Sequence, residues 1–177
     1  KNGKIDLVGW NFKKDGAIKL EGDWTFWWKK KISPDVFLTP DLLPANDGYF
    51  KQPGRWNGQK SPQSENEVLD GHGFATYYLK VDLGNRYQDL AIISPSGYTA
   101  FELFIKSSDD QNFRLLLSNG NPGTTRETTI PQYLDVESER LRMKGITEFV
   151  FIVSNFHHNS GGTTVPISIS DYDTMVE

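Results

Sequence analysis

The sequence predicts an all-β protein, an antiparallel β-sandwich of jelly-roll type with a few short helical turns. Three observations support this fold class. Seven short runs show strand-like character, most of them alternating apolar with polar residues. Sixteen glycines and nine prolines separate these runs, and no strand alternates with a helix of 10–15 residues, as a doubly wound fold would require. The runs cover residues 20–28, 74–83, 89–94, 98–106, 112–118, 147–155 and 165–170.

Most runs have a recognisable inner face. In 20–28, Trp24 and Phe26 alternate onto one side, which we expect to be the core, whereas Trp27 faces the other way and is the freer candidate for a ligand contact. Runs 74–83, 98–106, 112–118 and 165–170 each place apolar residues on one face. Run 89–94 is short and mostly apolar. Run 147–155 is apolar on both faces, which predicts a central strand.

The segments between these runs are mostly loops. Ser33-Pro34-Asp35 is typical of a helix start, with a capping residue before proline, and predicts one short turn through Phe37. A second turn is expected over 138–143, stopped by Gly145. The polar stretch 58–66 predicts a mobile loop.

Composition excludes several classes of function. The chain has 177 residues, no cysteine and a net charge of −4, which predicts one compact domain and argues against a nucleic-acid surface. Cysteine-based metal sites and nucleophiles are impossible. Neither a Gly-x-Ser-x-Gly elbow nor a glycine-rich phosphate loop occurs, so we expect no enzyme activity. The longest apolar run, 149–153, is far shorter than the about 20 residues of a membrane helix.

Trp56 stands inside the turn 53–58, where strand periodicity does not account for it. The residue either plugs the end of the sandwich or lines a site at its rim, and the sequence leaves both open. Arg55 beside it offers a planar donor fork for hydroxyl or carboxylate groups.

The chain has three histidines, His72, His157 and His158. Adjacent strand residues point to opposite faces, so His157 and His158 do not favour one metal site. Their structural alternative is that Asn155 and the histidines bind loop backbone groups. We predict no metal ligand and no cofactor, although a structural calcium without an identifiable site remains open. The predicted ligand contacts are Arg55, Trp56, His72, Tyr98, His157 and His158.

Several segments, in this order and spacing, resemble a known family. They are Asp6-Leu7-Val8-Gly9-Trp10-Asn11-Phe12, residues 20–28, Pro53-Gly54-Arg55-Trp56-Asn57, residues 73–79 and residues 154–162. Together they are similar to the extracytoplasmic domain of bacterial seven-transmembrane receptors with diverse intracellular signalling modules. That domain is similar to the galactose-binding jelly roll of family 2 glycoside hydrolases. The resemblance covers about residues 5–170.

The resemblance implies that residues 1–177 are a single periplasmic ligand-sensing domain excised from a longer membrane protein. Membrane helices and a cytoplasmic signalling domain would follow it, and its ligand would be a carbohydrate or related small molecule. The sequence departs from the family pattern at Tyr78, at 107–110 and at Asn159-Ser160, where it has fewer cations, so a neutral sugar is favoured over an anion.

Two alternatives remain open. The first alternative to the receptor domain is an accessory sugar-binding domain of a family 2-like glycoside hydrolase. The second is a structural or dimerising module without a small ligand.

Overall fold

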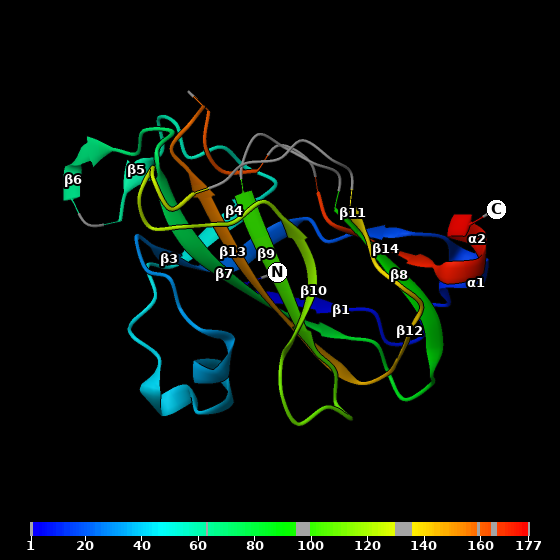
Figure 1. Ribbon diagram of the computed structural model, residues 1–177. Coiled ribbons are helices and arrows are strands. Elements are labelled where there is room, and N and C mark those ends of the chain that lie inside the picture. The colour runs from blue at the N-terminus through cyan, green and yellow to red at the C-terminus, as the bar shows by residue number, and fades with distance from the viewer. Residues whose placement is uncertain are drawn as a thin grey trace.

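A computed structural model describes residues 2–62, 64–94, 100–129, 136–158, 160–163 and 166–176. It confirms the antiparallel β-sandwich: two sheets pack face to face, and a small two-stranded ribbon projects from one end (Figure 1). In the part of the chain that it describes, no helix is long and apolar enough to cross a membrane.

The larger sheet has the strand order β10-β9-β13-β7-β3-β4, with β1 pairing parallel to β7. Its strands are β1 (Lys4–Asp6), β3 (Gly22–Trp28), β4 (Tyr49–Gln52), β7 (Gly73–Asp82), β9 (Ala100–Lys106), β10 (Arg114–Asn119) and β13 (Ile146–Asn155). The central position predicted for 147–155 is confirmed. β13 pairs along its full length with β7 on one side, and with β9 on the other.

The smaller sheet has the order β11-β8-β14-β2, and β12 also pairs with β8. Its strands are β2 (Ile18–Lys19), β8 (Gln88–Ser94), β11 (Val136–Glu137), β12 (Leu141–Met143) and β14 (Ser168–Asp171). The main core lies between the two sheets and is rich in aromatic side chains. Trp24 and Phe26 belong to it, as their alternation predicts.

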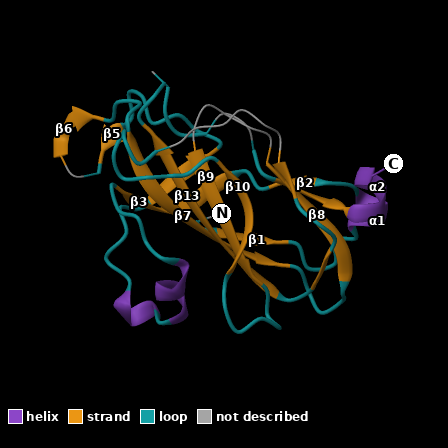
Figure 2. Cartoon of the chain, viewed as in Figure 1, coloured by secondary structure: helices purple, strands orange, loops and turns teal. Residues whose placement is uncertain are grey.

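The outer face of the larger sheet is buried as well. The 3₁₀ helices η1 (Pro34–Leu38) and η2 (Pro40–Leu42) form a separate lobe beside that sheet (Figure 2). Phe37 of η1 stacks on Tyr78 at 4.7 Å between ring centroids and meets Trp27 edge-on at 5.4 Å. Val150 and Ile152 of β13 complete this second cluster. Trp27 is therefore only 3% exposed, and the expectation that it is the freer tryptophan is wrong.

The segment that leads into the lobe is also bound to the sheet. Thr76 Oγ1 donates to the Lys30 carbonyl at 2.8 Å and accepts from the Ile32 amide at 3.1 Å. One buried hydroxyl thereby satisfies two backbone groups that would otherwise lie unpaired over an apolar face.

The structure corrects several element boundaries. The short turn through Phe37 is confirmed as η1. The turn expected over 138–143 is wrong, because Leu141–Met143 pairs with β8 as β12. The stretch 58–66 is a loop only in part, since β5 (Lys60–Ser61) and β6 (Ser64–Val68) form the projecting ribbon. Two short helices, α1 (Phe12–Asp15) and α2 (Tyr172–Val176), were not predicted.

Replacing Phe37 by alanine should lower the free energy of unfolding by about 3 kcal/mol, the usual cost of removing a buried aromatic ring. The loss would come from the contacts with Trp27 and Tyr78. Urea unfolding followed by tryptophan fluorescence measures it. Leu42→Ala is the matched control in the same lobe, because Leu42 is 70% exposed. Equal and small effects of the two variants would show that the lobe does not stabilise the sheet.

Candidate functional site

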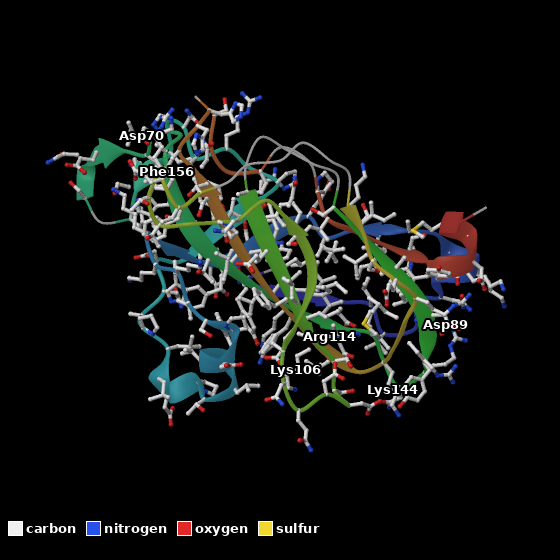
Figure 3. All side chains as sticks on the ribbon, in the orientation of Figure 1. Asp70, Asp89, Lys106, Arg114, Lys144 and Phe156 are labelled. Atoms are coloured by element: carbon white, nitrogen blue, oxygen red, sulfur yellow. The ribbon has the colours of Figure 1, made fainter. Side chains whose placement is uncertain are left out.

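Three segments meet at one end of the sandwich, which we call the loop end: residues 53–58, residues 69–72, and the described residues 155–158 and 160–163 of the loop after β13. The end is defined by the register of the central strands, in which Asn155 at the end of β13 pairs with Gly73 at the start of β7. Figure 3 labels Asp70 and Phe156 there, and Asp89 and Lys144 at the opposite end. Loops at the ends of a rigid sandwich are common positions for binding residues.

Asn155 holds two of these segments together. Its side chain is 2% exposed, and Nδ2 lies 2.6 Å from the Gly71 carbonyl, 2.8 Å from that of His158 and 3.2 Å from that of Ser160. Its Oδ1 accepts from the His158 amide at 3.2 Å. A single buried amide thus satisfies backbone groups of 69–72 and 155–163. The structural role that the sequence left open for Asn155 is the one observed.

The third segment, 53–58, pairs directly with the loop after β13. The Trp56 amide donates to the Gly161 carbonyl at 3.0 Å, the Gly161 amide donates to Asn57 Oδ1 at 3.0 Å, and Arg55 forms an isolated antiparallel bridge with Gly162. A Cβ atom on Gly161 would overlap the Gly71 carbonyl and the Trp56 ring. Glycine at this position is what allows the three segments to approach one another.

Trp56 is the plug of the loop end. Its side chain is 0% exposed. The indole Nε1 donates to Tyr77 Oη at 2.7 Å, and the ring meets Trp28 edge-on at 4.9 Å. Burial raises the pKa of the Tyr77 hydroxyl, so it stays protonated and hydrogen-bonded. In this conformation the indole presents no face to a ligand, which corrects its placement among the ligand contacts.

The other predicted contacts are only partly brought together. Arg55, His72 and His157 are exposed and His158 is half-buried. His157 Nε2 lies 2.9 Å from the Thr129 carbonyl, which joins the loop after β13 to the segment after β10. Tyr98 lies outside the described residues. Among those described, no group of three or more His, Asp or Glu residues is placed to hold a metal ion.

His72 lines a hollow of about 160 Å³ between the ribbon and the start of β7. The His72 amide donates to Asp70 Oδ1 at 2.6 Å, which fixes the turn that carries both side chains. The wall combines hydrogen-bond donors and acceptors with the edge of a buried indole. Its residues are Trp28, Lys29, Ser61, Glu67, Val68, Leu69, Asp70 and His72. Such a wall suits a group with several hydroxyls.

Sequence reasoning missed both the ribbon side of this hollow and a larger hollow at the opposite end. Glu67 lies in β6, whose pairing with β5 was not visible in the sequence, and Asp70 lies in the turn that follows β6. The larger hollow is lined by residues 8–15 and 83–88. The sequence feature that could have indicated this hollow is Trp10 next to Asn11, because the Asn11 side chain caps α1.

No family model matches the sequence, and no curated protein matches it. Solved structures do share its fold. The Faecalibacterium prausnitzii β-glucuronidase has a TM-score of 0.57 at 13% identity, over 88% of this chain and 31% of that enzyme. A Ruminococcus gnavus β-glucuronidase in complex with uronic isofagomine gives 0.55 at 12%, over 87% and 28%.

An Eisenbergiella tayi family 2 β-galacturonidase bound to galacturonate gives 0.53 at 11%, over 88% of this chain and 24% of that one. This chain therefore spans between a quarter and a third of these enzymes. At such identities the likeness establishes the fold alone, a β-sandwich that these enzymes also contain.

Replacing Asn155 by aspartate should lower the free energy of unfolding by about 3 kcal/mol, because a carboxylate would face three carbonyl oxygens without a donor. Chemical unfolding measures the loss. Asn46→Asp is the matched control, since exposed Asn46 uses its Oδ1 to accept from the Gly48 amide, and aspartate keeps that acceptor. If Asn155→Asp were as mild as the control, the bonding role of Asn155 would be refuted.

Proposed function

We propose that this chain is the ligand-sensing module of a bacterial transmembrane receptor, without catalytic activity, exposed on the periplasmic side and binding a carbohydrate or related neutral small molecule. One observation carries the proposal. The segments 53–57, 73–79 and 154–162, on which the family resemblance rests, lie far apart in sequence, yet Asn57, Gly73 and Gly161 from them meet at the loop end around Asn155.

The hollow beside His72 is the proposed ligand site. Lys29 and the His72 ring offer donors, whereas Glu67 and Asp70 offer acceptors, and this mixture matches the hydroxyls of a sugar. At about 160 Å³ it is smaller than the 300 Å³ or more that is usual for a drug-sized ligand. We therefore expect it to hold one ring, with modest affinity in the micromolar to millimolar range.

Sensing would work through populations of conformations. A ligand shifts an equilibrium only by its differential affinity for two states. The ribbon β5–β6 forms one wall of the hollow, and Trp28 at the end of β3 with Lys29 and His72 forms the other. A ligand that bridges them would favour the arrangement in which the ribbon lies close to the large sheet, and this arrangement would be transmitted to the rest of the receptor.

The solved structures favour a second candidate, an accessory sugar-binding domain of a family 2-like glycoside hydrolase, because the neighbours are parts of such enzymes. The full-length sequence discriminates the two. Seven apolar spans of about 20 residues would support the receptor, and a catalytic β/α barrel would support the hydrolase. A structural or dimerising module is the remaining candidate, and it would bind no sugar.

The binding proposal predicts that a panel of neutral mono- and oligosaccharides, screened by thermal shift and then by calorimetry, contains a ligand whose affinity falls about tenfold or more in His72→Ala, the loss of one or two hydrogen bonds. The variant should fold normally, because the His72 side chain is exposed. Lys80→Ala, exposed on β7 away from the hollow, should bind like the parent. Absence of any ligand in the panel, or equal binding by His72→Ala, would count against the site.

A further inference from the structure

A hollow of about 470 Å³ lies at the end of the sandwich opposite the loop end. Two segments form it: residues 8–15, which follow β1, and residues 83–88, which comprise the connection from β7 to β8 and the first residue of β8. We call it the far-end hollow. Its volume lies within the range of small-molecule sites, about 300–1,000 Å³. None of the residues that the sequence singled out for binding lines it.

The walls of the far-end hollow are fixed to each other. Gln88 Oε1 accepts from the Phe12 amide at 3.0 Å, and its Nε2 donates to the Trp10 carbonyl at 3.0 Å. Asn11 Oδ1 accepts from the Lys13 and Lys14 amides, and the Asn11 amide donates to Asp15 Oδ2 at 2.9 Å. These bonds hold the shape without a ligand, which reduces the entropy that binding would cost.

The charged side chains that line the far-end hollow favour one kind of ligand charge. Lys14 and Arg86 line the hollow and are exposed, and among the described residues neither has a carboxylate within ion-pair distance. The wall also contains the Asp15 carboxylate, which caps the Asn11 amide. Two cations and one carboxylate leave a net charge of +1 in a chain whose total is −4. This charge balances a monoanion rather than a dianion.

The rest of the wall is suited to a ring. Trp10 is half-buried, and its Nε1 is already bonded to the Gly16 carbonyl at 3.0 Å, so the indole offers apolar surface rather than a donor. Val8, which is 60% exposed, and buried Leu83 extend this surface. An adjoining depression contains Asp89, Asp171 and Asp173 together with Lys13, and Asp89 and Asp173 are ion-paired with Arg140. This depression therefore adds no net positive charge that would favour a second negative charge on the ligand.

We propose that the far-end hollow binds a small monocarboxylate carried on a ring. The carboxylate would be held by the Arg86 guanidinium, whose planar fork matches its two oxygens, with the Lys14 ammonium beside it, and the ring would pack against Trp10. This site is separate from the proposed sugar site at the loop end and differs from it in the charge of its ligand.

Three ligands that share one ring test the proposal: D-glucuronate, D-glucose and D-glucose 6-phosphate. Titrated into ¹⁵N-labelled protein, glucuronate should shift the amides of residues 9–15 and 84–88, and should bind at least about tenfold more tightly than the other two, the effect of one charged hydrogen bond. Equal binding of glucose, or tighter binding of the phosphate, would overturn the assigned ligand class.

Single substitutions show which hollow binds glucuronate. Arg86→Gln and Lys14→Gln should each weaken glucuronate binding about tenfold, whereas Lys80→Gln, which removes an exposed charge elsewhere, should not. His72→Ala should leave glucuronate binding unchanged, so failure here and failure of the loop-end site are distinguishable. Unchanged affinity in Arg86→Gln, or amide shifts confined to residues 53–58, 69–72 and 155–163, would overturn the far-end site.

Discussion

The fold depends on β13, a strand that is paired on both edges and buried on both faces. Phe149, Phe151 and Val153 point into the sandwich, whereas Val150 and Ile152 point to the outer face of the large sheet. Burying apolar surface is the dominant favourable contribution to folding, so such a strand needs a cover on each side. The smaller sheet covers one face, and the lobe that carries Phe37 covers the other.

The same strand connects the core to the loop end. β13 ends at Asn155, whose amide bonds to the loops before β7 and after β13, and Trp56 closes the core directly beneath them. The loop end is thus a rigid frame with polar side chains on its surface. The far end is organised differently, by Gln88 and the capped turn of α1. One sandwich therefore presents two hollows of different charge, each held by buried or half-buried amide side chains.

Much of the fold was predictable because the alternation of apolar and polar residues along a strand indicates which side chains are buried. Trp24 and Phe26 were correctly placed in the core, and the two-sided apolar character of 147–155 correctly predicted the central strand. Trp27 was misjudged because its cover comes from a segment without periodicity. Strands β5 and β6 form a short polar hairpin in which alternation gives no clear inner face, and the three-residue β12 pairs with β8, a partner distant in sequence. The hollows were not predictable, since they lie between segments that only the tertiary structure brings together.

The most direct test of this account is the exchange of the Asn155 side-chain amide protons with solvent, measured by NMR. The account predicts that the two Nδ2 protons are shifted from the usual amide position and exchange far more slowly than those of exposed Asn46, because they are buried against the Gly71, His158 and Ser160 carbonyls. Exchange as fast as that of Asn46 would contradict it, since the loop end would then lack the fixed frame on which the proposed site rests.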